Sequence, residues 1–379
     1  PGESPDEILV WLPEDRIALT ADTVYRSYPN IYTIRGARFR DPRDWWGSID
    51  QIRSLQPEHL VPCHGGALSG ADEVEDVLCA YRDGIQYVFD QTVRGMNRGL
   101  HPDERAATIR LPDHLAEHPW LTQLYGQIEF CVRAVYTGLY GWFSGEVADL
   151  LHPPPAEEAA EVVALAGGAE AALDSLRAAV ADGRHRWAAR LARWLLVAGR
   201  ADGAASDASV LDDAQRDEVR RLKAHALRSL AYGTMNVNAR NWWLTEAAVL
   251  DGTIALDLPA VAQAVAKRQA HGNLDALSDA ENLEVVSLRL DPARAIDVQV
   301  RVGLRIVDGD AFTLAVRRGV CAIESGVVDP DVAVTLPRAV LHDLLTDHLG
   351  WAEAIGRDDV SVDGDADRPV RRVAHRAGL

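Results

Sequence analysis

Cysteine is scarce in this sequence, and its few copies lie far apart. The 379 residues include four cysteines, Cys63, Cys79, Cys131 and Cys321, and no two of them form a CxxC pair. Zinc fingers and dithiol redox centres depend on such pairs, so the sequence excludes both motifs. We expect all four thiols to be reduced and unpaired.

Long apolar runs and an excess of positive charge are also missing. No apolar run approaches the ~20 residues that a membrane-spanning helix needs, so we expect no membrane span. Lysine and arginine total 39 against 57 acidic residues, which gives a net charge of -18. A chain of this charge repels polyanions, so we expect no nucleic-acid partner. The 47% hydrophobic content is ordinary for a globular protein.

Three regions differ in their sequence pattern. Up to about residue 70, short strand-like runs such as ILVWL and IALTAD alternate with turns. From about 71 to 250, apolar residues recur at helical spacing. From about 254, the runs VQVRVGLRIV and FTLAVRRGVCAIESG indicate strands, and the helical PRAVLHDLLTDHL and strand-like DVSVDG follow. The sequence therefore predicts a multidomain chain with α/β, all-α and α+β regions at 1–75, 76–252 and 253–379.

The octet HLVPCHGG, residues 59–66, predicts a short buried strand followed by a tight turn. A strand that ends at Pro62 or Cys63 places His64 at the carboxyl end of a sheet. Ligands and metals gather at that end of open α/β sheets. The octet alone leaves an alternative open, in which His64 is a plain strand-end residue beside two glycines.

Two carboxylates could meet His64 at the sheet edge. Glu3 precedes the first predicted strand, and Asp22 follows the second. A neutral imidazole with carboxylates is the donor mixture of a hydrolytic zinc site that keeps one position open for water. Three such residues within seventy also occur by chance, so the donors alone do not establish a metal site.

The segments PGESPDE, TAD, IRGARFRD and VPCHGG, in this order, resemble the second half of a metallo-β-lactamase fold and, more closely, the alkylsulfatases built on it. The resemblance implies that Glu3, Asp22 and His64 are metal ligands, with Glu7 a weaker candidate than Glu3. Asp22 stands where the family usually has glutamate. The implied cofactor is zinc, with two ions in the intact protein.

The resemblance continues along nearly the whole chain. Residues 80–104 and 111–145 resemble the segment that leads into the alkylsulfatase dimerisation domain, and residues 254–379 resemble the family's sterol-carrier-like C-terminal domain. The implied fold is a partial metallo-β-lactamase αββα sandwich, a helical dimerisation domain and a sterol-carrier-protein-like α+β domain. The implied partners are a second copy of the chain, in a homodimer, and an alkyl sulfate substrate.

The HxHxDH motif that begins the family's metal site is missing, and no two of the twelve histidines are spaced as HxH. In the family this motif lies upstream of the PGTE-like loop. We therefore expect the chain to be a piece of a longer protein and to be inactive by itself.

Four arginines lie within nine residues, at positions 35, 38, 40 and 43. A guanidinium group can donate to two oxygens of a sulfate ester at once. The resemblance favours Arg35 as a sulfate contact and, less firmly, Arg40. In an extended chain, side chains alternate between two sides, so Arg38 and Arg40 would point to the same side. A solvated loop with scattered arginines is the alternative.

A second metal motif, HLAEH at residues 114–118, matches the inverted zincin pattern HxxEH. Pro119 follows directly and would end the helix at that turn, and no third ligand is evident nearby. An exposed polar helix face accounts better for this segment. The pair Trp242-Trp243 and the cluster Gly141-Trp142-Phe143 are typical of core or interface positions.

Two classes of function fit these patterns. The first is a hydrolase in which zinc-activated water splits an alkyl sulfate ester into alcohol and sulfate. The second is a non-catalytic, dimeric helical and lipid-carrier-like binding protein. The order and spacing of Glu3, Asp22, Arg35 and His64 favour the hydrolase, because fold resemblance supports a function only through its site residues.

Overall fold

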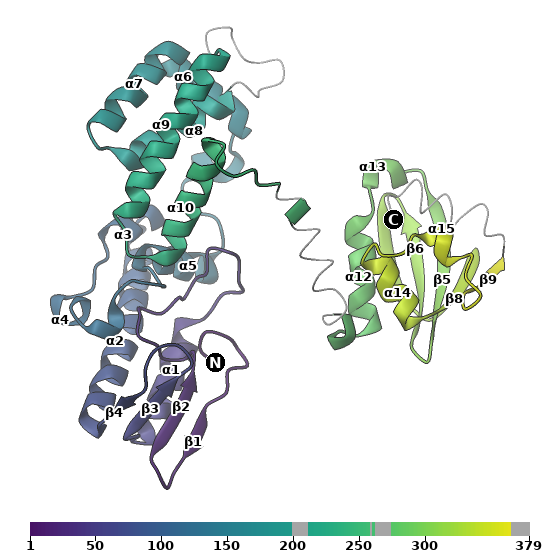
Figure 1. Ribbon diagram of the computed structural model, residues 1–379, viewed down its shortest axis with the longest axis horizontal. Helices are drawn as coiled ribbons and strands as arrows, with labels where there is room; N and C mark the ends of the chain where they lie inside the picture. The colour runs from purple at the N-terminus through teal and green to yellow at the C-terminus, as the bar shows by residue number, and fades with distance from the viewer. Residues whose placement is uncertain (199–210, 258–259, 262–273, 365–379) are drawn as a thin grey trace. The chain divides into compact units, whose positions relative to one another are not determined.

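The computed structural model describes residues 1–198, 211–257, 260–261 and 274–364. The chain forms two compact units, Pro1–Ala255 and Leu256–Leu379 (Figure 1). The chain is therefore a mixed α/β, multidomain protein. The boundaries at residues 75 and 252, which the sequence predicts, stay predictions. Among the described residues, no helix is long and apolar enough to cross a membrane. All four cysteines are free.

A four-stranded sheet lies at the start of the first unit. Its strands are β1 (Val10–Leu12), β2 (Ile17–Ala21), β3 (His59–Pro62) and β4 (Leu68–Ser69), in the order β1-β2-β3-β4. The strand predicted from HLVPCHGG is thus confirmed as β3. Strands β2 and β3 are parallel, and the other two pairs are antiparallel. Since parallel strands end at the same edge, the residues that follow β2 and β3 lie next to each other.

Two helices cover this sheet and share its core. Helix α1 (Pro42–Ser54) starts where the Asp41 side chain accepts a hydrogen bond from the Arg43 backbone N–H. Its Trp45, Ile49 and Ile52 recur on one face and are buried, as is the regular apolar face of α2 (Ala71–Met96). One continuous core joins residues of the sheet, α1, α2 and the chain as far as residue 132.

The rest of the first unit is helical, as the sequence predicts for residues 71–250. The further helices are α3 (Pro102–Thr108), α4 (Asp113–Ala116), η1 (Pro119–Leu121), α5 (Ile128–Tyr140), η2 (Val147–Leu151), α6 (Pro155–Leu165), α7 (Ala169–Ala181), α8 (His185–Ala198), α9 (Asp213–Tyr232) and α10 (Val237–Leu250). Helices α6 to α9 enclose a separate apolar core. The polar tract GRADGAASDAS at 199–209, whose glycine and serine content interrupts the helical pattern in the sequence, lies outside the described residues.

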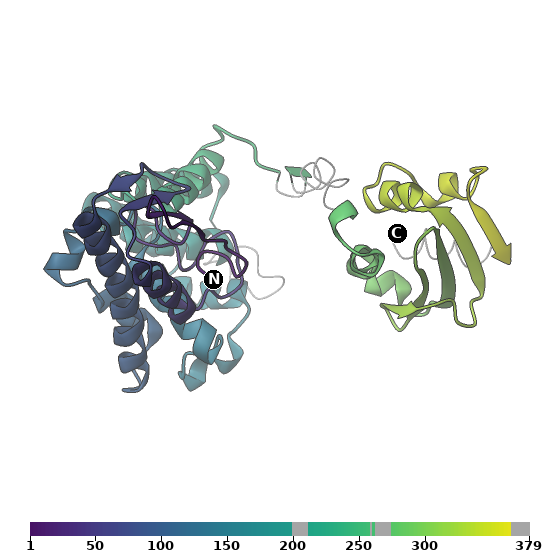
Figure 2. The ribbon, with the colours of Figure 1, turned by 90° about the horizontal axis from the view of Figure 1, so that it is seen from below.

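The second unit is a five-stranded sheet with helices, in agreement with the predicted α+β domain (Figure 2). The sheet order is β7-β6-β5-β8-β9, with β5 and β8 parallel and the other neighbours antiparallel. Its elements are α12 (Asp279–Arg289), α13 (Pro292–Ala295), β5 (Gln299–Val307), β6 (Ala311–Arg317), β7 (Val320–Ser325), β8 (Val332–Pro337), α14 (Arg338–Leu345), α15 (Trp351–Ala354) and β9 (Ser361–Gly364).

Candidate active site

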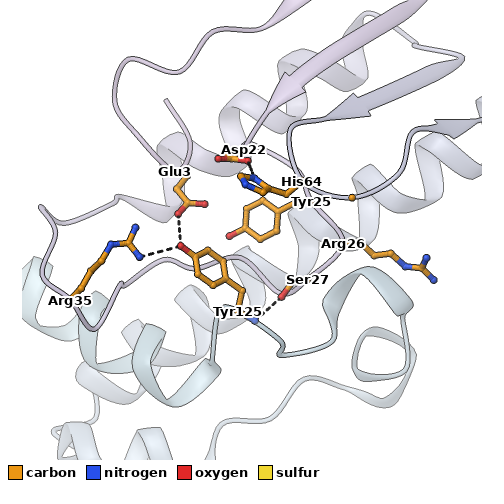
Figure 3. Close-up of a pocket in the computed structure, with 9 residues that line it drawn as sticks. Glu3, Asp22, Tyr25, Arg26, Ser27, Arg35, His64 and Tyr125 are labelled. Atoms are coloured by element: carbon orange, nitrogen blue, oxygen red, sulfur yellow. Dashed lines mark hydrogen bonds and ion pairs between the residues drawn. The ribbon is translucent and has the colours of Figure 1, made fainter. Parts of the chain in front are cut away.

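A pocket of about 570 Å³ opens at the carboxyl edge of β2 and β3 (Figure 3). The sequence analysis singled out four of the residues that line it, from loops up to 61 residues apart in the chain: Glu3, Asp22, Arg35 and His64. The other lining residues are Tyr25, Arg26, Ser27, Gly65 and Tyr125. The fold therefore brings most of the predicted site residues to one place.

Asp22 and His64 form the closest pair in this pocket. The parallel ladder ends with Ala21 opposite Pro62, and the Cys63 N–H donates to the Ala21 carbonyl at 3.0 Å. This register sets His64 Nδ1 2.5 Å from Asp22 Oδ1. The hydrogen bond and the charge of Asp22 raise the pKa of His64 above its usual value. The His64 side chain is 74% exposed, so its other ring nitrogen remains accessible from the pocket.

Glu7 fixes the two acidic loops against each other. Its carboxylate accepts hydrogen bonds from the backbone N–H groups of Glu3 and Asp22, at 2.9 and 2.8 Å, and from the Thr23 hydroxyl at 3.1 Å. Gly2 permits this arrangement, because a Cβ at Gly2 would lie 2.2 Å from a Glu7 oxygen. With three donors engaged, Glu7 acts as a support for the site. Partial burial nevertheless raises its pKa.

Glu3 is held by a cation and a phenol. Arg40 Nη1 donates to Glu3 Oε1 at 3.0 Å and also to the Asn30 carbonyl at 2.6 Å. Both side chains of the ion pair are only 13% exposed. Tyr125 donates from its hydroxyl to the same Glu3 oxygen at 3.4 Å. Arg40 is not one of the described residues that line the pocket, and it contacts the site only by way of its bond to Glu3.

Arg35 faces the pocket with most of its donors unused by the protein. Its Nη1 donates to the Tyr125 hydroxyl at 3.4 Å, and this contact raises the Arg35 pKa further above its high ordinary value. The residue is exposed at the pocket mouth. A guanidinium group in this position can take an anion bidentately.

Tyr125 was missed by the sequence reasoning, although it contacts both Glu3 and Arg35. It lies in the loop before α5, about ninety residues beyond the arginine cluster, and its N–H donates to Ser27 Oγ at 3.0 Å. The Ser27 hydroxyl in turn donates to the Thr122 carbonyl at 3.1 Å. No local spacing in the sequence signals this contact, since it depends on how the helical region packs on the sheet.

The donor types in this pocket suit zinc, but the described residues form only part of a metal site. Imidazole and carboxylates are usual zinc donors. However, no three His, Cys, Asp or Glu side chains are gathered closely enough to hold a metal ion anywhere in the described ranges. Asp22 and His64 contact each other, whereas Glu3 is engaged by Arg40 and Tyr125. The predicted ligand roles therefore stay predictions.

The HxxEH segment does not present two histidines from one helix. Helix α4 ends at Ala116, and His118 instead begins the 3-10 helix η1, where its Nδ1 accepts from the Trp120 N–H. Its Nε2 lies 3.3 Å from Asp76 Oδ2. His118 is therefore a capping residue, in keeping with the expected stop at Pro119.

Two family models match this chain in sequence. "Alkyl sulfatase dimerisation" matches residues 101–252, and "Alkyl sulfatase C-terminal" matches residues 268–373. Tyr125 falls inside the first of these matches, so the candidate pocket joins the sheet loops to the dimerisation region.

Several similar proteins are named as alkylsulfatases. A linear primary-alkylsulfatase of Pseudomonas sp. is 38% identical over 96% of this chain and 68% of its own length. An (R)-specific secondary-alkylsulfatase of Pseudomonas sp. is 29% identical over 96% of this chain and 53% of its own length. The solved structure of the inverting sec-alkylsulfatase Pisa1 from Pseudomonas sp. has a TM-score of 0.84 at 27% identity, over 100% of this chain and 57% of that one. The chain thus spans between half and about two thirds of these relatives, and it belongs to the alkylsulfatase family.

Proposed function

We propose that the pocket binds the sulfate group of an alkyl sulfate ester for hydrolysis to alcohol and sulfate. The observation that carries the proposal is the position of Arg35, an exposed guanidinium held by Tyr125 at the mouth of a pocket that also contains Asp22 and His64. The similar proteins named as alkylsulfatases support it.

Each contact around Arg35 has a role in this proposal. Arg35 binds two sulfate oxygens, and Tyr125 orients its guanidinium while also donating to Glu3. Arg40 holds the Glu3 carboxylate in place through its ion pair. The expectation that Arg40 itself contacts sulfate stays a proposal, and it requires this ion pair to open.

Zinc is the proposed cofactor, and Glu3, Asp22 and His64 are its proposed donors from this chain. Bound zinc would supply an activated water for attack on the ester. A dinuclear site needs more donors than these three, so we expect weak zinc binding and no turnover until further donors are supplied. For that site we propose a fold in which the first sheet is part of a metallo-β-lactamase αββα sandwich.

The sulfate-binding role is tested by titrating the chain with decyl sulfate in a calorimeter. A charge-assisted hydrogen bond contributes about 1.5–3 kcal/mol, and Arg35→Gln removes the charge from this bond. We therefore expect the variant to bind decyl sulfate about 10- to 150-fold more weakly. Arg38→Gln is the matched control, because Arg38 is an exposed arginine in the same loop that does not line the pocket. Equal affinities of the two variants would remove Arg35 from the site.

The zinc role is tested by elemental analysis and by complementation. Co-expression with an alkylsulfatase segment that carries HxHxDH is expected to restore zinc binding and decyl sulfate hydrolysis. His64→Ala then abolishes both, whereas His59→Ala, at the other end of β3 where it contacts Ser69, leaves both intact. Full zinc occupancy and unchanged turnover in the His64 variant would refute the ligand role.

A homodimer is the proposed assembly, with contacts through residues 139–151. This stretch exposes six large apolar side chains within the region matched by the dimerisation model. Burial of such a surface against a second copy is favourable. Light scattering is expected to give twice the chain mass, and Trp142→Ser, at a residue 70% exposed, should shift it toward one chain mass. Leu288→Ser, 85% exposed in the second unit, serves as the control.

The second unit is proposed to be a sterol-carrier-like domain that helps to hold the alkyl tail. Along β5 every second residue from Val300 to Ile306 is buried, whereas both ends of the strand and Arg305 are exposed, which is typical of a sheet with one covered face. The alternative of a non-catalytic lipid-carrier-like protein is not favoured by the comparisons, since the similar proteins are named as sulfatases. A long-chain alcohol titrated into the chain tests the tail-binding role.

A further inference from the structure

Helix α5 contacts the loop that carries Arg35 near both of the helix ends. Tyr125, in the segment just before α5, accepts a hydrogen bond from Arg35 Nη1 at 3.4 Å (Figure 3). Gly138, in the last turn of α5, lies against the aromatic ring of Phe39. The stretch from Arg35 to Phe39, which we call the arginine loop, is therefore held by α5 at its first and at its last residue.

The ring of Phe39 occupies the space that a side chain at position 138 would need. A Cβ at Gly138 would overlap with three ring carbons of Phe39, of which Cζ would lie 2.5 Å away. Gly138 is part of α5 itself, and an α-helix requires no positive φ. Glycine within a helix is less favourable than alanine. The close approach of the Phe39 ring is therefore the structural reason for glycine at this position.

The arginine loop has little other support along its length. All five of its residues are exposed. A turn holds its start, where the Gly36 N–H donates to the Thr33 carbonyl at 3.1 Å, and the ion pair of Arg40 lies just beyond its end. Phe39 is the one large apolar side chain of the loop, and it is itself 39% exposed. Exposed segments with few packed side chains open locally at low cost, so the contact between Phe39 and Gly138 stabilises the closed loop.

We propose that Phe39 is a positioning residue for sulfate binding, because it docks the arginine loop on α5 and thereby fixes Arg35. Phe39 is not one of the described residues that line the pocket, so it acts through Arg35. A loop that is docked before the ligand arrives pays less of the ordering cost on binding. The inference rests on the proposed sulfate-binding role of Arg35.

Calorimetric titration with hexyl sulfate and with decyl sulfate measures the contribution of Phe39. Without its ring, the loop must be ordered when the ligand binds, so Phe39→Ala should weaken binding of both esters by about 2- to 13-fold, the range for ordering one side chain. A loss with decyl sulfate alone would make Phe39 a contact of the alkyl tail and would overturn the proposal. In an Arg35→Gln chain, Phe39→Ala should have no further effect, whereas an equal loss there would show that Phe39 acts without Arg35.

Gly138→Ala tests the same contact from the side of the helix. The added methyl group displaces the Phe39 ring, so this variant should lose as much affinity as Phe39→Ala, and the double variant should lose no more than either single variant. Alanine also favours the helix, so the urea unfolding midpoint should not fall. Weaker binding without lower stability separates positioning from general unfolding. Gly47→Ala, where a Cβ in α1 meets no atom within 4 Å, is the matched control and should leave binding unchanged.

Limited trypsin digestion measures the docking of the loop without any ligand. Cleavage after Arg35 requires the loop to open, so it should be about 2- to 13-fold faster in Phe39→Ala and in Gly138→Ala, and unchanged in Gly47→Ala. If the unchanged chain binds neither ester, the proposed function fails, whereas these rates still decide whether Phe39 docks the loop. Equal cleavage rates in all variants, or full affinity for both esters in Gly138→Ala, would refute the inference.

Discussion

Gly126→Ala tests how the helical region is docked on the sheet and how Tyr125 reaches the site. A Cβ at Gly126 would lie 2.0 Å from the Pro29 carbonyl oxygen and 2.5 Å from the Tyr28 carbonyl oxygen. Both contacts are to backbone, so no side-chain rotation can relieve them. The two segments must therefore separate by about 1 Å or more to reach ordinary van der Waals distances.

The energetic cost follows from the contacts that such a shift breaks. The Gly126 N–H donates to the Tyr28 carbonyl at 3.0 Å, and the Tyr125 N–H donates to Ser27 Oγ at 3.0 Å. Two hydrogen bonds at about 1 kcal/mol each, with about 1–3 kcal/mol for overpacking, give a loss of about 3–5 kcal/mol. The same shift withdraws the Tyr125 hydroxyl from Arg35, so binding of decyl sulfate should weaken as well.

Urea unfolding followed by tryptophan fluorescence measures this loss, because all tryptophans except Trp351 lie in the first unit. Gly47→Ala is the matched control, since a Cβ at this position in α1 meets no atom within 4 Å. That variant should be neutral or more stable by up to about 1 kcal/mol. A change below about 0.5 kcal/mol in Gly126→Ala would show that the segments are not packed as described.

Three further predictions concern single contacts. NMR titration should give His64 a pKa above 6.5, and Asp22→Asn should lower that pKa toward 6.5. The contact with Asp22 stabilises the fold fully below the pKa of His64 in the unfolded chain, and this stabilisation is lost as the pH rises through the pKa of the folded protein. Because the pKa of Glu7 is raised in the folded protein, ionisation of Glu7 should lower the free energy of unfolding as the pH rises above 4.5. Unfolding midpoints measured from pH 4.5 upward should show this decrease in the unchanged chain and not in Glu7→Gln. Asp279→Ala should destabilise the second unit by about 1–3 kcal/mol in thermal unfolding, because the buried carboxylate accepts two hydrogen bonds from Arg338.

The sequence alone determined the elements with strong local patterns. The apolar octet that ends in two glycines predicted β3, and the strand-like runs VQVRVGLRIV and FTLAVRRGVCAIESG predicted the strands found as β5, β6 and β7. The proposed zinc ligands Glu3, Asp22 and His64 could be named because each follows or precedes a strand. A parallel pairing of β2 with β3 then brings Asp22 and His64 to one edge.

Only the tertiary structure decided which partners these residues have. Arg38 and Arg40 alternate in sequence, yet Arg38 is exposed whereas Arg40 is largely buried against Glu3. Glu7 supports two loops and Tyr125 joins Glu3 to Arg35, through contacts that span up to 122 residues of chain. Local patterns carry no information on such contacts, because they depend on how helices and loops pack together after the elements have formed.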